Sequence, residues 1–426
     1  MNFRKTTGLV AAVILASAAA ADGLTVTDGE LVRDGVAFRA VGVNYYDGFL
    51  RHLRDGNDTS FEAGMAELGR RGIPLARFNA GGFFADDWDL YRSDPTEYFN
   101  RMDRFVDSAR SAGVGLVPSL FWNSDEIAAI FGETRTAWTD VNSQTRAFAR
   151  QYTADIVNRY RNNEAILMWE FGNEFNLQQD LPTTATRPAM PSDGVRDAVA
   201  EFQQTVRSLD PSRATTTGHS MARPQAWHLR NEDRFAIDSA AQFEEVTIGD
   251  HSAVDVISVH AYHQNTVGPT PNDGDAPPTR FGESDLTYDD VIADLMRISD
   301  EQNQPLFVGE FGVADDFTHG IPGNPNPTTE QRLQYLLDVL VDNEVPLSAI
   351  WVYDRINDDG TFTITGDNPR SYQLDLIAAA NARLTAIPEP SSMTVIGFVT
   401  VWTATRRRRR ARIRPRQTSN QGCVHD

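Results

Sequence analysis

Short apolar runs alternate with helical repeats along this chain, and this alternation constrains the fold more than any other feature. Apolar residues at helical spacing separate the runs, as in the stretch 148–160, where Phe, Tyr, Ile and Tyr recur every four residues. Strands that alternate with helices pair in parallel, and eight such units predict a (β/α)8 barrel in the α/β class. The runs of strand length are Ala40–Tyr45, Ile73–Asn79, Val114–Trp122, Ile166–Phe171, Ala214–His219, Val256–Tyr262, Leu306–Phe311 and Ala349–Tyr353.

The barrel is expected to be one domain, covering residues 22–386. Two Asp-Gly dipeptides, at 28–29 and 34–35, separate short alternating runs before the first barrel strand and predict an N-terminal β-hairpin. No glycine-rich nucleotide-binding motif follows any run, which argues against an open nucleotide-binding sheet. No Pro-, Ser- or Gly-rich linker divides the region, and the Pro/Asp-rich stretch 266–280 is interpreted as a long loop after the sixth strand.

The charge distribution narrows the functional classes. The chain has 59 acidic and 39 basic residues, for a net charge of −20. The two terminal segments hold ten of the basic residues and two of the acidic ones, so residues 22–386 carry 57 acidic against 29 basic residues, or −28. Such a surface repels nucleic acid and anionic lipid, and we exclude a nucleic-acid role. The single cysteine, Cys423, lies near the C-terminus, so the barrel region has no cysteine nucleophile, disulfide or cysteine metal ligand.

Both terminal segments have the character of targeting signals. Residues 1–21 combine basic residues, an apolar run and small residues, which predicts a signal peptide and export. Residues 387–426 contain the triplet Pro388-Glu389-Pro390, a short apolar segment and the cluster Arg406–Arg410. This order resembles the PEP-CTERM sorting signal, which implies processing by an exosortase at the cell envelope. The apolar segment is shorter than the ~20 residues that span a bilayer as a helix.

Polar and aromatic residues collect where the predicted strands end. In a (β/α)8 barrel the carboxyl ends of all strands share one face, and chemistry is located there. The fourth run is followed by Glu174 and the seventh contains Glu310, 136 residues apart in sequence but expected at one barrel mouth. Two carboxylates that face each other can serve glycoside hydrolysis, in which one donates a proton while the other attacks or activates water. The residue type alone does not decide which glutamate donates the proton and which attacks or activates water.

A metal site is the rival interpretation of these strand ends. His260 and His263 are close in sequence, but on a strand they point to opposite faces, and no HExxH motif or calcium-binding loop accompanies them. We therefore expect no catalytic metal and no cofactor.

The sequence around these glutamates resembles glycoside hydrolase family 5, the cellulase/mannanase family of clan A. The resemblance spans about residues 36–386 and rests on Arg77 in LARFN, Asn173-Glu174 in WEFGNE, His260 and Tyr262 in SVHAYH, Glu310 in VGEFG and Trp351 in IWVYD. It implies a retaining mechanism with Glu174 as acid/base and Glu310 as nucleophile.

The same resemblance implies supporting roles. Asn173 would bind the sugar 2-hydroxyl, Arg77 and Tyr262 would hold and ionise Glu310, His260 would orient the acid/base, and Trp351 would form the floor beneath the sugar. Physical reasoning supports part of this, because an arginine beside a carboxylate lowers the carboxylate pKa and an indole face packs against a pyranose.

Some assignments stay open. Glu170 lies four residues before Glu174, on the same strand face, and is interpreted as a buried supporting carboxylate, although its position alone allows an exchange of roles. Many family members have a histidine near the end of the third strand, whereas Trp122 or Asn123 occupies that corner here. Asn44 is a further candidate at the first strand end. Other aromatic residues could build sugar subsites or pack in loops: Tyr45, Tyr46, Phe84, Trp88 and Trp227.

Two functional hypotheses from different classes remain. The first is an exported, retaining glycosidase that acts on a β-glycan of the mannan or glucan type. The second is a non-catalytic carbohydrate-binding or envelope-structural protein on a barrel scaffold. Both glutamates are present together with Arg77, Asn173 and Tyr262, which favours the enzyme. No protein partner is indicated beyond the exosortase machinery that the tail implies.

Overall fold

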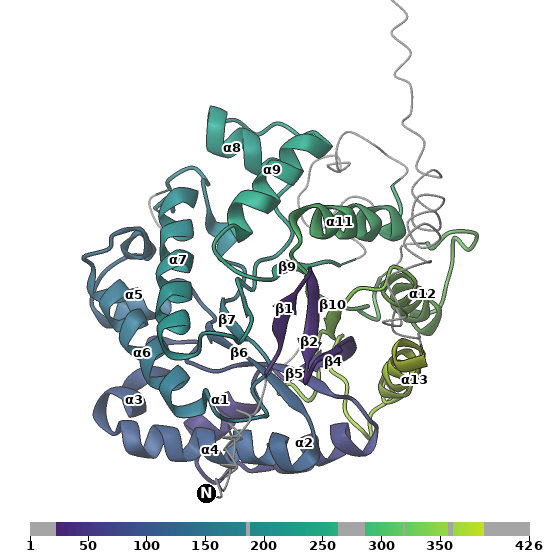
Figure 1. Ribbon diagram of the computed structural model, residues 1–426, viewed down its shortest axis with the longest axis horizontal. Coiled ribbons are helices and arrows are strands. Elements are labelled where there is room, and N and C mark those ends of the chain that lie inside the picture. Colours follow the sequence, from purple (N-terminus) through teal and green to yellow (C-terminus); the bar gives the residue numbers. More distant parts are fainter. Residues whose placement is uncertain (1–22, 185–187, 263–285, 318–319, 357–360, 387–426) are drawn as a thin grey trace, which may run out of the picture. The chain divides into compact units, whose positions relative to one another are not determined.

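The computed structural model describes residues 23–184, 188–262, 286–317, 320–356 and 361–386 (Figure 1). The predicted signal peptide, the predicted tail, the loop at 266–280 and His263 lie outside the described residues. One compact unit extends to Leu384, and residues 385–426 form a second unit. The boundary drawn from the sequence at residue 386 stays a prediction.

Eight parallel strands form the centre of the first unit. Their order in the sheet is β8-β7-β6-β5-β4-β11-β10-β9, and a parallel bridge between Thr216 and Val256 links the two edges. The predicted (β/α)8 barrel is therefore confirmed. The strands are β4 (Ala40–Asn44), β5 (Leu75–Asn79), β6 (Gly115–Phe121), β7 (Trp169–Gly172), β8 (Thr215–Thr216), β9 (Ile257–His260), β10 (Leu306–Phe311) and β11 (Leu347–Ile350).

A long helix follows each barrel strand, and Figure 1 shows helices surrounding the strands. The helical repeat at 148–160 lies in α6, and α12 shows the same amphipathic spacing. In α12 the Thr328 hydroxyl accepts a hydrogen bond from the backbone of Gln331 at the first turn, and leucines 333, 336, 337 and 340 are buried. The long helices are α2 (Ser60–Arg70), α4 (Pro95–Ala112), α6 (Gln144–Tyr160), α7 (Ser192–Leu209), α9 (Ala240–His251), α11 (Tyr288–Gln302), α12 (Thr329–Asp342) and α13 (Tyr372–Ala386).

Shorter helices lie in the connections that leave the strands. They extend the loops on the face where the strands end, and two of them, η3 and α8, border the candidate site described below. Their bounds are α1 (Gly48–Arg54), η1 (Ala85–Trp88), α3 (Asp89–Ser93), α5 (Glu126–Ile130), η2 (Arg135–Thr139), η3 (Phe175–Gln178) and α8 (Ala226–Glu232). Among the helices of the described part, none is long and apolar enough to cross a bilayer.

The N-terminal hairpin is confirmed and extended by a third strand. β1 (Thr25–Thr27), β2 (Glu30–Arg33) and β3 (Val36–Ala37) form an antiparallel sheet. Both Asp-Gly dipeptides adopt positive φ at each residue, 51° and 78° in the first and 54° and 80° in the second, as two-residue hairpin turns require.

This small sheet closes the end of the barrel opposite the candidate site. The amide of Leu24 donates to the carbonyl of Leu167, and the carbonyl of Leu24 accepts from the amide of Ala214, both at 2.7 Å. Leu24 and Leu31 pack with the first residues of the barrel strands, such as Leu75 and Leu347, in one buried cluster. Apolar contacts therefore seal this end, and the strand ends on the other face are left for polar residues.

Candidate active site

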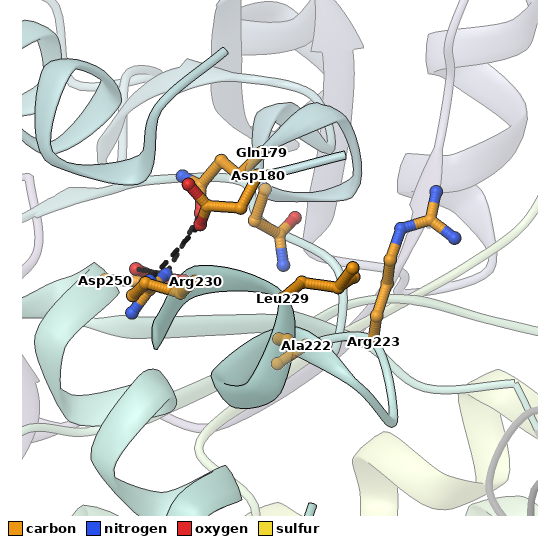
Figure 2. Close-up of a pocket in the computed structure, with 9 residues that line it drawn as sticks. Gln179, Asp180, Ala222, Arg223, Leu229, Arg230 and Asp250 are labelled. Carbon is orange, nitrogen blue, oxygen red and sulfur yellow. Dashed lines mark hydrogen bonds and ion pairs between the residues drawn. The ribbon is translucent and has the colours of Figure 1, made fainter. Parts of the chain in front are cut away.

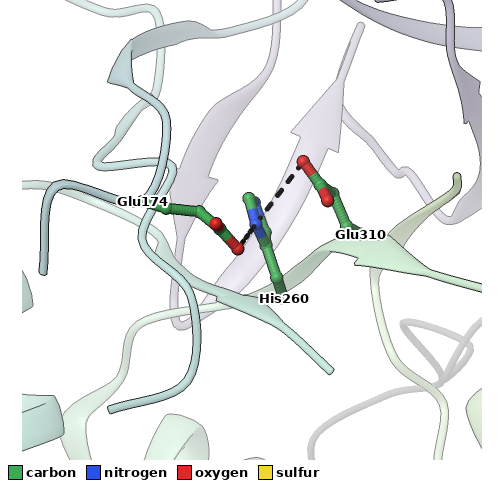
Figure 3. Close-up of side chains that lie close together, drawn as sticks. All are labelled: Glu174, His260 and Glu310. Atoms are coloured by element: carbon green, nitrogen blue, oxygen red, sulfur yellow. Dashed lines mark hydrogen bonds and ion pairs between the residues drawn. The ribbon is translucent and has the colours of Figure 1, made fainter. Parts of the chain in front are cut away.

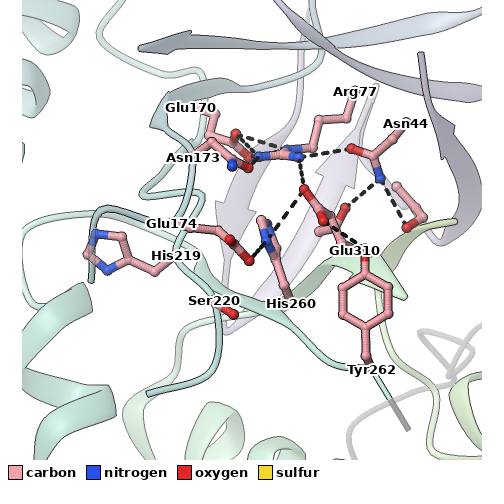
Figure 4. Close-up of polar contacts among 12 residues, drawn as sticks. Asn44, Arg77, Glu170, Asn173, Glu174, His219, Ser220, His260, Tyr262 and Glu310 are labelled. Carbon is pink, nitrogen blue, oxygen red and sulfur yellow. Dashed lines mark hydrogen bonds and ion pairs between the residues drawn. The ribbon is translucent and has the colours of Figure 1, made fainter. Parts of the chain in front are cut away.

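Polar side chains from β4, β5, β7, β9 and β10 converge at the carboxyl ends of the strands (Figure 4). Arg77 is the centre of this network and is fully buried. Its Nε donates to Glu170 at 2.9 Å, and one terminal nitrogen, Nη1, donates to Asn44 at 2.8 Å and to Glu310 at 2.9 Å. Its other terminal nitrogen, Nη2, donates to Asn173 at 2.8 Å and pairs with Glu170 at 2.8 Å. All five guanidinium donors thus have acceptors, which a buried arginine requires.

Glu170 and Asn44 support the site from within the barrel. Glu170 is fully buried, and both of its oxygens accept from Arg77. The amide of Asn44 donates to the carbonyls of Gly309 at 2.9 Å and Ala349 at 3.2 Å, which ties β4 to β10 and β11. Neither side chain is placed to meet a ligand, so the geometry leaves Glu174 and Glu310 as the two carboxylates at the mouth.

Glu310 and Glu174 face each other across His260 (Figure 3). One oxygen of each carboxylate and a ring nitrogen of His260 all lie within 4.8 Å of one another. The Nδ1 of His260 is 2.9 Å from Glu174 and 3.5 Å from Glu310. Glu310 also accepts from the hydroxyl of Tyr262 at 2.8 Å. The side chain of Glu174 is 32% exposed and that of Glu310 only 7%, so Glu174 is the more accessible of the two.

The pKa of Glu310 differs from the expectation that Arg77 would lower it. Burial is the largest influence and raises the pKa of Glu310 above its ordinary value, while His260, Arg77 and the hydrogen bond from Tyr262 oppose the rise. The negative charge of Glu174 adds to it. The expectation considered only the ion pair of Glu310 with Arg77. It left out the loss of hydration on burial, which can be judged only when the depth of Glu310 in the fold is known.

Glu174 and His260 are also shifted by burial. Burial raises the pKa of Glu174, against smaller effects of Ser220, Arg77 and Arg223. Burial lowers the pKa of His260 to about 4, so its ring is neutral at pH 7. The Nε2 of His260 has no partner among the described residues. The ring proton therefore belongs on Nδ1, from which it is donated to Glu174.

A set of hydrogen bonds fixes the turn that presents Glu174. Glu174 has a φ of 52°, a left-handed conformation that costs about 1 kcal/mol or more for a residue with a side chain. Its amide donates to the carbonyl of Gly218 at 2.9 Å. The side chain of Asn176 makes two bonds with the backbone of Ser220, at 2.7 and 3.0 Å. The guanidinium of Arg223 donates to the carbonyl of Leu177 at 2.8 Å. The segments that follow β7 and β8 thereby hold the strained residue.

Sequence reasoning missed Asn176, Ser220 and Arg223. Ser220 directly follows the last residue of the fifth apolar run, which was the one available signal. The pairing of two loops 44 residues apart has no counterpart in strand or helix periodicity.

A small pocket lies beside this turn, between η3 and α8 (Figure 2). Arg230 crosses it and pairs with Asp180 and Asp250. Its space suits a water-sized group rather than a sugar ring, and neither catalytic candidate lines it. The pocket is separate from the carboxylate pair. The lining residues are Asn176, Gln179, Asp180, Ala222, Arg223, Ala226, Leu229, Arg230 and Asp250.

Aromatic rings from the loops after β4, β6 and β11 form one cluster beside Arg77. Trp351 directly follows β11, and its ring is stacked at 28° on that of Trp122, 6.3 Å between centroids. The ring of Trp122 covers the guanidinium of Arg77 at 4.5 Å, so Trp122 occupies the corner where the family resemblance led us to look for histidine. Tyr46 contacts both indoles, at 4.8 and 5.8 Å.

Other candidates lie away from the mouth. Tyr45 and Trp88 are fully buried and belong to the core, while Trp227 is half-buried on α8. His219, at the end of the fifth run, is fully buried with its ring 5.5 Å from that of His251. The amide of Asn123 donates to the carbonyl of Phe83 and so supports a loop.

Among the described residues, the side chains best placed to hold a cation are Glu174, His260 and Glu310 themselves. The Arg77 guanidinium, 2.9 Å from Glu310, already neutralises part of their charge and disfavours a metal there. The chemistry that this arrangement offers is proton transfer and nucleophilic attack by two carboxyl groups of different surroundings.

A (β/α)8 barrel that presents two close glutamates at its carboxyl face has the site geometry typical of glycoside hydrolases. The Cellulase (glycosyl hydrolase family 5) profile matches residues 43–354, and the chain belongs to this family.

Curated relatives are mannan-degrading enzymes of fungi. The chain is 26% identical over 210 residues to mannan endo-1,4-beta-mannosidase F of Aspergillus fumigatus, covering 43% of this chain and 44% of that protein. It is 27% identical over 179 residues to mannan endo-1,4-beta-mannosidase A of Podospora anserina, covering 36% and 45%. The chain thus spans less than half the length of the curated relatives it matches.

Solved structures share the fold at low sequence identity. The endo-1,4-beta-mannanase of Rhizomucor miehei superimposes with a TM-score of 0.60 at 15% identity, over 85% of this chain and all of that one. A beta-glucanase of Saccharophagus degradans superimposes with a TM-score of 0.53 at 15% identity, over 85% and 94%.

Proposed function

We propose that this protein hydrolyses a β-1,4-linked mannan with retention of configuration, with Glu310 as nucleophile and Glu174 as acid/base. The observation that carries the proposal is the approach of the two carboxylates, whose nearest oxygens lie within 4.8 Å. Retaining glycosidases have carboxyl groups about 5–5.5 Å apart, whereas inverting enzymes need about 6.5–9.5 Å to admit a water molecule between carboxylate and sugar. The short separation supports double displacement.

The surroundings of the two glutamates support these roles. Glu310 accepts hydrogen bonds from the charged Arg77 at 2.9 Å and from Tyr262 at 2.8 Å, and both stabilise its anion. The nearest partner of Glu174 is the neutral His260, so the protonation of Glu174 is opposed less than that of Glu310. With two close carboxyl groups sharing one proton, the proton belongs on Glu174 and the charge on Glu310.

The reaction then follows in two steps. The Glu310 carboxylate attacks the anomeric carbon while the bond to the glycosidic oxygen breaks and Glu174 gives its proton to that oxygen. In the second step the Glu174 carboxylate takes a proton from water as the water oxygen attacks the anomeric carbon and the bond to Glu310 breaks. Both groups end in their starting protonation states.

Neighbouring residues have supporting roles in this proposal. The carbonyl oxygen of Asn173 is occupied by Arg77, which directs the amide nitrogen outward to the sugar 2-hydroxyl. His260 orients Glu174, and Trp351 packs beneath the sugar at the cleavage point. Mannan is proposed as substrate because the curated relatives are named for it, and glucan is the neighbouring alternative within the family.

A substrate panel with stereochemical analysis tests this function. Purified protein is incubated with β-1,4-mannan, glucomannan and carboxymethylcellulose, and new reducing ends are measured. Proton NMR during the first minutes should show the β-anomer first on the preferred polysaccharide. Release of the α-anomer first would contradict double displacement. Tight binding of a polysaccharide without hydrolysis would favour the non-catalytic hypothesis instead.

Export and envelope sorting are proposed from the terminal segments. The signal-peptide pattern in residues 1–21 and the PEP-CTERM-like order in residues 387–426 support them. The arginines that follow the apolar segment are expected to keep that end at the cytoplasmic face during transfer.

Deletion of residues 387–426 should leave the melting temperature and the activity of the barrel unchanged, because the last described helix, α13, ends at Ala386. In the native host, the deletion should move the protein from the envelope to the medium, which fractionation of tagged protein would show. A truncated protein that unfolds, or a full-length protein that is secreted unprocessed, would contradict this prediction.

A further inference from the structure

Backbone hydrogen bonds between the end of β7 and the segment after β8 reach as far as Glu174. The amide of Gly172 donates to the carbonyl of Thr217 at 3.1 Å, and the amide of Glu174 donates to the carbonyl of Gly218 at 2.9 Å. The two backbones are so close here that a Cβ atom on Gly218 would lie 1.8 Å from the carbonyl oxygen of Gly172. The position of the Glu174 backbone is therefore set by the segment after β8.

Past Glu174, a side chain takes the place of the backbone in this contact. The chain enters η3, where the amide of Leu177 donates to the carbonyl of Glu174 at 3.0 Å. The side-chain amide of Asn176 donates to the carbonyl of Ser220 at 2.7 Å, and its oxygen accepts from the amide of Ser220 at 3.0 Å. Asn176 is 8% exposed, so water competes little for these bonds. Asn176 thus joins the two loops just beyond Glu174.

Glu174 needs such an anchor because its backbone is strained. Its φ of 52° and ψ of 30° are left-handed, a conformation that a residue with a side chain keeps only where its surroundings fix it. The carboxyl group must at the same time stay 2.9 Å from Nδ1 of His260. A change of φ to negative values would redirect the side chain, and the carboxyl group would leave its place beside His260.

The small pocket beside the turn leaves room for this change. Asn176 and Arg223 both line the pocket, so the turn is held on this side by hydrogen bonds more than by close packing. Arg223 acts further along the loop, through its bond to the carbonyl of Leu177 at 2.8 Å. The two bonds from Asn176 are the ones that hold the turn next to Glu174 itself.

We propose that Asn176 is the positioning residue of the acid/base, because its side chain fixes the turn from which Glu174 gives and takes protons. The inference rests on the proposed function and adds to it a residue that acts through the backbone of Glu174. Loss of Asn176 should therefore impair proton transfer to the leaving oxygen and from the attacking water. It should leave the attack by Glu310 intact, so the defect should grow with the need of the leaving group for a proton.

Asn176→Ala tests this role, and Asn123→Ala is the matched control. Asn123 is half-buried in the loop after β6, and its side chain also makes two bonds to the backbone, with the carbonyl of Phe83 at 3.1 Å and the amide of Asp125 at 3.0 Å. The value of kcat/KM is measured on polysaccharide and on phenyl, 4-nitrophenyl and 2,4-dinitrophenyl β-glycosides of mannobiose and cellobiose.

Asn176→Ala should lower kcat/KM about 100-fold on the polysaccharide, because a misplaced acid protonates the leaving sugar poorly. On the 2,4-dinitrophenyl glycoside kcat/KM should stay near the wild-type value, while kcat falls because the second step still needs Glu174 as base. Asn176→Gln keeps an amide and should recover part of the loss on polysaccharide. Asn123→Ala should change kcat/KM by one common factor on every substrate.

An equal loss for all leaving groups in Asn176→Ala, or no loss on polysaccharide, would overturn the proposal. Melting temperatures identify a folding defect, and if Asn176→Ala does not fold, Asn176→Ser and Asn176→Gln provide the comparison.

Hydrogen exchange tests the anchor without reference to activity. The amide of Glu174, followed by mass spectrometry in peptides that span residues 172–178, should exchange faster in Asn176→Ala than in the wild type and Asn123→Ala. Equal exchange in the three proteins would reject the anchor. A wild type that cleaves no glycan would instead reject the proposed function, whatever the exchange rates show.

Discussion

Glu310→Ala should lower kcat on every substrate by about 10⁴-fold or more, because no nucleophile remains to form the glycosyl-enzyme. The alanine leaves a space beside the anomeric carbon that a small anion can enter. Azide should therefore restore turnover and give a glycosyl azide of inverted configuration. The product is identified by NMR, and the rate is measured on an aryl β-mannoside and an aryl β-glucoside.

Glu174→Ala is the comparison that separates the two glutamates. An activated aryl leaving group needs little protonation, so the first step should survive in this variant while the second becomes slow. Azide should then release a β-glycosyl azide with retention. Recovery of the inverted azide from Glu174→Ala, and of the retained one from Glu310→Ala, would mean that the roles are reversed.

Arg77→Met should reduce the free energy of unfolding by about 3–5 kcal/mol, the usual cost of removing one partner of a buried ion pair. The change leaves Glu170 fully buried without a counter-charge and also removes donors from Glu310, Asn44 and Asn173. Urea denaturation monitored by tryptophan fluorescence measures the loss. Activity should fall as well, because the nucleophile loses the charge that favours its anion.

Arg104→Met provides the matched control for this loss. Arg104 pairs with Glu62 at 3.1 Å, but both side chains are about half exposed, at 50% and 52%. A surface pair of this kind contributes about 0–1 kcal/mol. The double variant Arg77→Met/Glu170→Gln should recover part of the stability, since the unpaired charge is gone. A loss below about 1 kcal/mol for Arg77→Met would show that the buried network does not hold the barrel together.

Strand and helix periodicity sufficed to predict the barrel. The helices between the eight apolar runs impose parallel pairing, and this pairing predicted the barrel without predicting the order of its strands. The extent of each strand was harder to predict. The run at 214–219 contains only two residues in the ladder, Thr215 and Thr216, and the carbonyls of Thr217 and Gly218 accept from the amides of Gly172, at the end of β7, and of Glu174.

The candidate site was predictable where strands place residues and less so where loops do. Glu310 and Arg77 lie within strands that end on one face of the barrel, and the family resemblance implied their contact. Tyr45 and Tyr46 show the limit of the method, since adjacent residues after β4 lie in the core and at the mouth respectively. The hydrogen bonds of Asn176, Ser220 and Arg223 that hold the turn at Glu174 depend on two loops meeting in space. The direction of the Glu310 pKa shift depends on depth, which no local pattern encodes.

The small sheet at the base of the barrel also governs when the chain can fold. The backbone hydrogen bonds of Leu24 cannot form until Leu167 and Ala214 have been synthesised. β4 pairs with β11, which lies more than 300 residues later in the chain. Contacts between such distant segments slow folding, because loop entropy is lost before they form. A chain emerging from the ribosome therefore cannot complete its barrel until nearly all of it has been synthesised. Under the export proposed above, this delay would keep the chain unfolded while it crosses the membrane.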